Sequence, residues 1–295
     1  MNTSILSYTL TPVILTYVIS AMLALGLSLT VGQIVGPLRN LRITISAVVA
    51  SYVILPLLAA LIARFFGLDP ALRYGLVLLA MAAGAEAGPI LAAKSNANVA
   101  LAGGILVMSI GITIIYVPLM LGVFLPGVKF SVGKLLLKLL LTIVAPLLLG
   151  LFIKSRFEKT ADHVVEYLHK VSRLFIVLLT LNIIGLYHKD IMGLVGSGAI
   201  LAGLVFVIAS FGIGYLLGWP ERGTRLTMGY MHGARNASAA VMVASAVFKD
   251  QPDVMLMIAT VVILMLVILI PVSFLCKIKP GAAGQSEPSP VKQSN

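Results

Sequence analysis

The sequence is dominated by apolar stretches of about 20 residues that alternate with short polar connections. A helix needs about 20 apolar residues to cross the hydrocarbon core of a bilayer. The sequence therefore predicts an all-α integral membrane protein with nine transmembrane helices. The nine segments are residues 12–34, 43–64, 71–93, 97–122, 135–153, 172–187, 191–219, 226–248 and 254–276.

The connections between these segments are too short to build a soluble domain. Only 11% of the residues are charged and 60% are hydrophobic, whereas soluble domains carry about 25% charged residues. We therefore predict a single polytopic transmembrane domain over residues 1–279. Residues 280–295 are rich in proline, glycine and serine, and we predict a disordered cytoplasmic tail there.

The net charge of +11 reflects basic residues that are spread over the connections. They do not cluster with aromatic residues, so we expect no nucleic-acid partner. With the N-terminus outside, the inner connections hold thirteen lysines and arginines and the outer ones seven, and Arg235 is the remaining one. Because inner connections carry the basic excess, we predict that the N-terminus is outside and the C-terminus inside. The lipid bilayer is the expected partner, and the cytoplasmic (plasma) membrane the expected location.

No residue pattern indicates an enzyme. The chain contains no nucleophile–base arrangement, phosphate-binding loop or cluster of metal ligands. The single cysteine, Cys276, cannot form an intramolecular disulfide or a zinc site by itself. We therefore predict no catalytic residues, no bound metal and no cofactor.

The third segment holds a charged residue beside helix-breaking residues. Glu86 is preceded by Gly84 and followed by Gly88 and Pro89. Proline lacks a backbone donor, and it disfavours helical geometry in the residue before it. We therefore predict that this helix is interrupted near residues 84–89.

The eighth segment carries small and polar residues where a plain membrane helix has leucine and valine. A charge at midspan costs about 2.5–3.5 kcal/mol on insertion scales, so an ionisable residue there is by default a functional hypothesis. We predict a second interruption near residues 229–236. The residues that motivate it are Gly229, Gly233, Arg235, Asn236 and Ser238.

The two interrupted segments resemble each other. Gly84-Ala85-Glu86-Ala87 aligns with Gly233-Ala234-Arg235-Asn236, five segments later. Because five is odd, the two segments cross the membrane in opposite directions, which indicates an inverted repeat. Paired interrupted helices in two inverted halves point to a transport site near the midplane. The sequence therefore predicts a secondary transporter with its site at the two interruptions.

The candidate substrate- or ion-binding residues are the polar side chains in and near these segments: Glu86, Arg235, Asn236, His232, Asn98 and Ser238. Structural roles compete with this interpretation. Glycine and alanine permit close helix packing in membranes, Glu86 and Arg235 can form a buried ion pair, and Asn98 and Asn236 can cap helices. Both interpretations are open at the level of the sequence.

Over nearly its whole length the chain resembles the bile acid:sodium symporter (BASS, or solute carrier 10) family. The resemblance is carried by "GLSLT" (26–30), Asn98-Val99-Ala100-Leu101, "GIGYLLG" (212–218) and Gly233-Ala234-Arg235-Asn236. It implies a panel domain of the first, fifth and sixth segments and a core domain of the others. It also implies two helices that cross at their interruptions. Substrates in this family are small organic anions, among them bile acids, steroid sulfates and pyruvate.

The chain departs from the family at the positions of the sodium ligands. The family pattern Glu-x-Gly-x-Gln-Asn reads Met231-His232-Gly233-Ala234-Arg235-Asn236 here, so Met231 and Arg235 replace a glutamate and a glutamine. The serine and asparagine of the first crossing helix and two hydroxyl residues of the next one are also missing; their positions hold Gly88, Pro89, Ala102 and Leu106. Hard cations require several oxygen ligands. Sodium coupling is therefore in doubt, and a fixed arginine can stand in for a bound cation.

Three functions are compatible with these residues. The first is a secondary transporter that moves an organic anion by alternating access, sodium-independent or coupled to a proton or sodium. The second is a proton-coupled exchanger or cation/proton antiporter that uses Glu86. The third is a non-transporting receptor or structural subunit that contains a Glu86–Arg235 ion pair.

Overall fold

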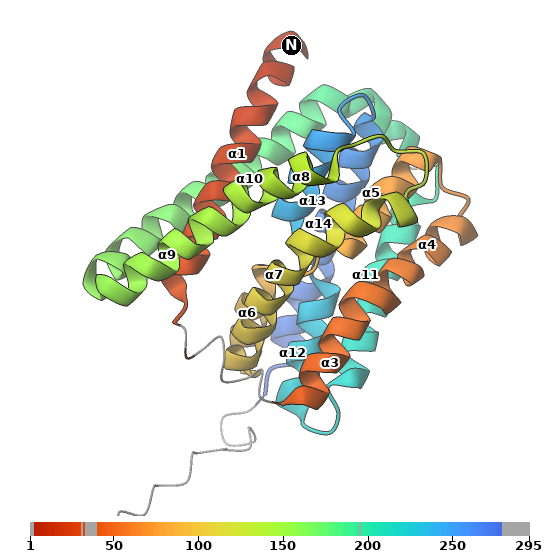
Figure 1. Ribbon diagram of the computed structural model, residues 1–295. Coiled ribbons are helices and arrows are strands. Elements are labelled where there is room, and N and C mark those ends of the chain that lie inside the picture. Colours follow the sequence, from red (N-terminus) through yellow and green to blue (C-terminus); the bar gives the residue numbers. More distant parts are fainter. Residues whose placement is uncertain (1–2, 31, 33–39, 195, 279–295) are drawn as a thin grey trace, which may run out of the picture.

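The structure is a computed structural model that describes residues 3–30, 32, 40–194 and 196–278. Every regular element in these ranges is a helix, as the sequence predicts (Figure 1). The predicted tail at 280–295 lies outside the described residues. The helices are α1 (Thr3–Ser28), α3 (Leu41–Val49), η2 (Ala50–Ile54), α4 (Leu55–Phe65), α5 (Pro70–Met81), α6 (Ala87–Lys94), α7 (Val99–Phe124), α8 (Val132–Leu139), η3 (Leu140–Val144), α9 (Ala145–Arg156), α10 (Glu158–Leu194), α11 (Ala199–Leu217), α12 (Arg222–Gly233), α13 (Ala237–Val247) and α14 (Pro252–Leu275).

Six helices of the described residues are long and apolar enough to cross a membrane. They correspond to the first, second, fourth, fifth, seventh and ninth predicted segments: Thr9–Ser28, Leu41–Phe65, Val99–Phe124, Val132–Arg156, Ala199–Leu217 and Pro252–Leu275. The third and eighth segments are each divided into two shorter helices, α5 with α6 and α12 with α13. The chain is therefore an integral membrane protein, and the count of nine spans stays a prediction.

The sixth segment differs most from its prediction. We expected a connection before residue 172, but α10 begins at Glu158. The first half of α10 is charged, and Lys170 Nζ lies 2.8 Å from Glu166 Oε1, four residues earlier. Pairs at this spacing stabilise a helix. A criterion based on apolarity does not detect a helix whose first half is polar.

Two of the long helices contain a π-helical turn that precedes a proline. The N–H of Leu55 donates to the carbonyl of Ala50 at the end of η2, and Pro56 follows. The η3 turn ends in the same way before Pro146. Local π geometry is a common way for a helix to accommodate a proline in a membrane. The two helices therefore continue past their prolines.

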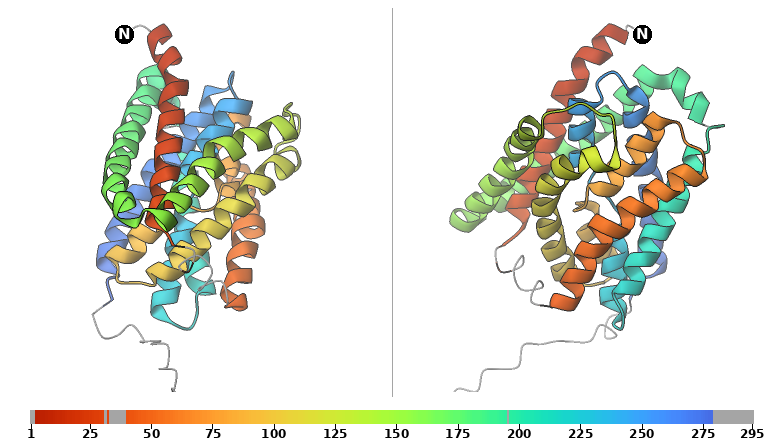
Figure 2. Two further views of the ribbon diagram at one scale, coloured as in Figure 1. Left: turned by 60° about the vertical axis from the view of Figure 1, so that its left-hand side comes forward. Right: turned by 45° about the vertical axis from the view of Figure 1, so that its right-hand side comes forward.

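Helix α1 packs along α10 and against α9 at one side of the molecule (Figure 1, Figure 2). Gly26 and Gly150 bring α1 and α9 into backbone contact. A Cβ on Gly150 would lie 2.5 Å from the carbonyl oxygen of Leu23, and a Cβ on Gly26 would overlap the carbonyl oxygen of Leu147. Small residues permit this close approach of membrane helices. We call α1, α9 and α10 the three-helix layer.

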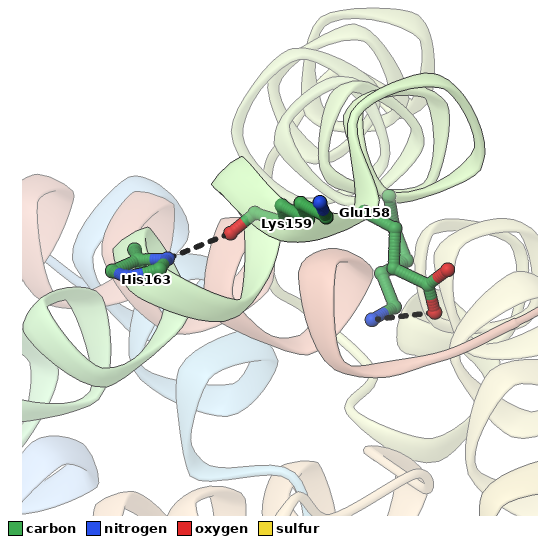
Figure 3. Close-up of polar contacts among 4 residues, drawn as sticks. Glu158, Lys159 and His163 are labelled. Carbon is green, nitrogen blue, oxygen red and sulfur yellow. Dashed lines mark hydrogen bonds and ion pairs between the residues drawn. The ribbon is translucent and has the colours of Figure 1, made fainter.

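Local polar contacts hold the corner between α9 and α10 (Figure 3). Lys154 Nζ lies 3.4 Å from Glu158 Oε1. The Nδ1 atom of His163 lies 2.8 Å from the carbonyl oxygen of Lys159, one turn earlier. Both contacts join residues four apart, so they stabilise the start of α10.

The remaining helices show one order of elements twice. A half-helix, an interruption, a second half-helix and a long helix occur as α5, α6 and α7, and again as α12, α13 and α14. The connections at 66–69 and 125–131 lie at the end of the molecule where α1 begins, and those at 95–98 and 218–221 lie at the opposite end (Figure 1). Connections that we predicted on different sides of the membrane are thus separated.

Candidate functional site

The first interruption is present, a little earlier than predicted. α5 ends at Met81 and α6 begins at Ala87, so residues 82–86 are nonhelical rather than 84–89. Pro89 lies in the first turn of α6, where the missing N–H of proline costs no helical hydrogen bond. The proline therefore begins the second half-helix and does not break it.

The second interruption occupies residues 234–236, the last part of the predicted range. Gly229 and Gly233 lie inside α12 instead. A Cβ on Gly229 would lie 2.8 Å from the ring of Phe211, and one on Gly233 would lie 3.1 Å from Phe211 Cβ. These two glycines therefore allow α12 to pack closely on α11.

The two interruptions cross and are hydrogen-bonded to each other. The backbone N–H of Asn236 donates to the carbonyl of Ala82 at 2.9 Å. Gly84 has a φ of +86°, and a Cβ there would lie 2.9 Å from Ile110 of α7. Only glycine adopts this conformation readily and leaves room for α7. The crossing is therefore formed by nonhelical backbone that packs closely against α7.

Arg235 is buried at this crossing, with 1% of its surface exposed. Its guanidinium donates to backbone carbonyls: Nε to Leu79 at 3.5 Å, Nη2 to Ala80, and Nη2 to Ser51 at 3.4 Å. Leu79 and Ala80 lie in the last turn of α5, where the helix dipole is negative. The Leu79 carbonyl also accepts the N–H of Ala82 at 3.1 Å. The guanidinium thus occupies a cradle of oxygen atoms that suits a cation. Nη1 has no protein partner among the described residues.

The Ser51 carbonyl is available because of Pro56. In the π turn, the N–H of Leu55 donates to Ala50. The next residue, Pro56, has no N–H to give to Ser51. Sequence reasoning missed this acceptor, although a proline five residues after a midspan serine was the available signal.

Asn236 both caps a helix and faces the cavity described below. Its Oδ1 accepts the N–H of Ala239 at 2.9 Å, which makes it the N-cap of α13. Its Nδ2 is buried and has no hydrogen-bond partner in the described part of the chain. The N-terminus of α13 carries the positive end of the helix dipole. Nη1 of Arg235 and Nδ2 of Asn236 are therefore buried donors of two adjacent residues, and neither has a partner among the described residues.

Glu86 and Ser238 lie together, but Glu86 and Arg235 do not form an ion pair. Ser238 Oγ donates to Glu86 Oε1 at 3.1 Å. Tyr17 of α1 lies beside both residues. No ion pair among the described residues includes Glu86 or Arg235. The buried Glu86–Arg235 pair on which a purely structural interpretation depends is therefore not formed.

A cavity of about 780 Å³ separates the three-helix layer from the crossing. Its inner end is formed by Glu86, Arg235 and Asn236, which come from the two interruptions. Apolar residues of α1, α6, α7, α10 and α14 form most of the remaining wall: Ala21, Leu25, Ala87, Ile90, Ala93, Val99, Leu106, Ile176, Val262, Met265 and Leu266. An apolar pocket with a few convergent polar groups is typical of a binding site for a small molecule.

The exposed polar residues of the lining, which we call the mouth of this cavity, are Ser28, Glu166, His169 and Arg173. Ser172 also lines the cavity but is buried. The Nε2 atom of His169 lies 3.4 Å from Ser28 Oγ. His169 precedes the predicted membrane segment, and partial burial, followed by the charge of Arg173, lowers its pKa. His169 is therefore mainly neutral at neutral pH. Sequence analysis did not assign His169 to the site, because His169 lies in the first half of α10, which was expected to be a connection.

His232 and Asn98 are outside the cavity lining. His232 is fully buried, with Nδ1 at 2.7 Å from the Met228 carbonyl oxygen and Nε2 at 3.3 Å from that of Ala47. It connects α12 to α3. Asn98 accepts the N–H of Leu101 at 2.9 Å and is the N-cap of α7. The contacts of both residues are those of packing and capping.

Apolar atoms fill the region of the replaced ligand positions. Gly88 lies directly against the thioether of Met231, so a side chain at position 88 would overlap its sulfur. Ala102 and Leu106 are fully buried. None of these four side chains supplies an oxygen ligand. Gly88 and Met231 do converge, but their contact consists of carbon and sulfur atoms.

A profile described as the Sodium Bile acid symporter family matches residues 3–194. The match includes the first interruption and the three-helix layer. It ends before α12 and α13, where Met231 and Arg235 lie.

Curated relatives show the same similarity. "Uncharacterized sodium-dependent transporter YocS" of Bacillus subtilis (strain 168) is 27% identical over 199 residues, which are 67% of this chain and 60% of that protein. "Probable sodium/metabolite cotransporter BASS1, chloroplastic" of Arabidopsis thaliana is 25% identical over 234 residues, 78% of this chain and 58% of that protein. "Probable sodium/metabolite cotransporter BASS3, chloroplastic" of the same plant is 27% identical over 199 residues, 66% of this chain and 45% of that protein. The matched regions thus span 60% or less of each of these relatives.

Proposed function

This chain belongs to the sodium bile acid symporter family, and on that premise we propose that it is a secondary transporter that moves an organic anion without sodium. In this proposal a panel domain, which contains the three-helix layer, and a core domain of two inverted repeats move relative to each other. The anion binds in the cavity between them. The Bacillus subtilis relative is named as sodium-dependent and the plant relatives as sodium/metabolite cotransporters, so this chain would differ from them in its coupling.

One observation carries the proposal. The guanidinium of Arg235 contacts the carbonyls of Leu79, Ala80 and Ser51, which are the acceptors that a cation at the end of a half-helix would use. A fixed guanidinium keeps the positive charge at the crossing throughout the transport cycle. It cannot dissociate, so it cannot couple transport to an ion gradient.

The donors at the inner end support an anionic substrate. Nη1 of Arg235 and Nδ2 of Asn236 are buried, and no described residue is their hydrogen-bond partner. Hydrogen bonds to a charged group, here the anion, contribute about 1.5–3 kcal/mol each, and the N-terminus of α13 adds a favourable dipole. The apolar wall favours a substrate with a hydrophobic body.

Uptake by proteoliposomes tests the proposal. Radiolabelled taurocholate, estrone sulfate and pyruvate would be offered in sodium buffer and in potassium buffer, and exchange of preloaded anion would be measured in parallel. We expect uptake or exchange of at least one anion, with equal rates in the two buffers. Sigmoidal dependence of the rate on sodium would refute sodium independence. Absence of both uptake and exchange for all three anions would refute transport of these substrate classes.

A further inference from the structure

Glu86 is the ionisable residue of the inner end that the proposed function does not use. It is half-buried and is the last residue before α6. It accepts one hydrogen bond, from Ser238 Oγ at 3.1 Å. No basic side chain of the described residues is within ion-pair distance of it. Its charge is therefore solvated by a hydroxyl but has no counter-ion in direct contact.

The ionisable groups around Glu86 come from three elements. Tyr17 lies beside it on α1, and Arg235 lines the same inner end from the second interruption. Glu166, His169 and Arg173 of α10 lie at the mouth. The parts of α7 and α14 that line the cavity are apolar. Glu86 is thus the single carboxyl at the inner end of the described cavity.

The charges of the site balance in two states. With Arg235 positive and Glu86 ionised, the empty site is neutral. A bound monovalent anion makes the site neutral again only if Glu86 also takes up a proton. An empty site with protonated Glu86 has one net positive charge, and an anion-bound site with ionised Glu86 has one net negative charge. Either net charge in a largely apolar cavity is unfavourable within a membrane. An anion and a proton therefore favour each other's binding, and this coupling is reciprocal.

We infer that Glu86 is the proton-binding site of the transporter and that one proton moves with each monovalent anion; this inference rests on the proposed function. The proton binds a carboxylate oxygen of Glu86 from the side where the anion enters. It returns to water on the other side when the anion leaves. No other bond is made or broken. Only the two neutral states pass between the inward- and outward-facing conformations, so transport is electroneutral.

The test measures accumulation of taurocholate and estrone sulfate, which stay ionised and carry no proton themselves. Proteoliposomes of the full chain would be held at zero membrane potential with potassium and valinomycin, and a pH gradient, alkaline inside, would be imposed. At equilibrium we expect about tenfold accumulation per pH unit, which corresponds to about 1.4 kcal/mol for one proton. A membrane potential alone should cause no accumulation.

Variants test whether Glu86, and not another ionisable residue, binds the transported proton. Glu86→Gln keeps an oxygen that accepts from Ser238, so anion exchange should continue. The amide cannot take up a proton, so accumulation driven by a pH gradient should be abolished. Glu86→Asp should retain both. Glu158→Gln and His163→Gln, at the corner between α9 and α10 and outside the cavity lining, are matched controls and should behave like the wild type. Accumulation by Glu86→Gln equal to that of the wild type would overturn the inference. If the wild type exchanges anions but a pH gradient does not drive accumulation, the inference would also be overturned, while the proposed function would remain intact.

Infrared difference spectra of the purified protein give a reading that needs no transport. Addition of taurocholate at neutral pH should produce a protonated carboxyl band that is missing in Glu86→Gln. An identical band in the variant would contradict protonation of Glu86. Failure of the wild type to exchange any anion would instead refute the proposed function, and the inference would fail with it.

Discussion

The backbone N–H of Asn236 donates to the carbonyl of Ala82 over 2.9 Å, and this bond joins the two interrupted helices. It uses a carbonyl just beyond the end of α5, while Arg235 uses those of Leu79 and Ala80 in the preceding turn. The second interruption therefore supplies donors to carbonyls at the end of α5 and in the first interruption. A change at one interruption should alter the geometry of the other.

Arg235→Ala should both destabilise the protein and remove anion binding. The carbonyls of Ala80 and Ser51 would lose the guanidinium as a donor, and an unpaired buried polar group costs on the order of 1–3 kcal/mol. Arg235→Lys keeps the charge but not the planar set of donors, so it should recover part of the stability. Thermal unfolding in detergent and taurocholate binding would be measured for both variants. Binding of wild-type strength in Arg235→Ala would exclude an electrostatic role for this residue.

The double variant Met231→Glu with Arg235→Gln should gain a response to sodium. It restores two oxygen ligands where the family pattern has them and removes the fixed cation. A ligand at one hundred times its Kd stabilises the folded state by about 2.7 kcal/mol. Sodium should therefore raise the Tm of the double variant but not that of the wild type, with potassium as the control. Equal shifts in both proteins would argue against replacement of sodium by Arg235.

Asn236→Asp should fold but bind anions poorly. The carboxylate still accepts the Ala239 N–H and caps α13, but the Nδ2 donor is lost and a negative charge is added. We expect affinity for taurocholate to fall by at least about tenfold, or about 1.4 kcal/mol. Asn98→Asp is the matched control, because Asn98 caps α7 outside the cavity lining. Equal losses in both variants would indicate a general effect on folding.

Gly26→Ala and Gly150→Ala should disturb the three-helix layer. Each added Cβ meets backbone atoms of the facing helix, which cannot move aside as a flexible side chain would. Overpacking of this kind costs about 1–3 kcal/mol, which would appear as a lower Tm in lipid nanodiscs. Gly122→Ala in α7 is the control, since its Cβ would meet nothing within 4 Å. That change should be neutral or stabilise the helix by up to about 1 kcal/mol. A stability of Gly26→Ala equal to that of the control would show that α1 and α9 are not in tight contact.

The sequence by itself determined the features that depend on local composition. Long apolar runs require a membrane, and the small and polar residues of the third and eighth segments indicated where their helices are divided. The first interruption came two residues early because proline ends one helix and begins another equally well, as Pro89 does in α6. The replaced ligand positions were also visible, since they are changes of residue type.

Only the tertiary structure decided what each polar group contacts. Arg235 donates to Leu79, 156 residues away in the chain, and to Ser51, 184 residues away. These acceptors are backbone carbonyls, which every residue has, so no residue type marks them in a sequence. Glu86 and Arg235 aligned in the two repeats and suggested an ion pair, yet each has other partners. The direction of a buried side chain depends on which acceptors distant segments leave free, and that is settled only when the helices pack together.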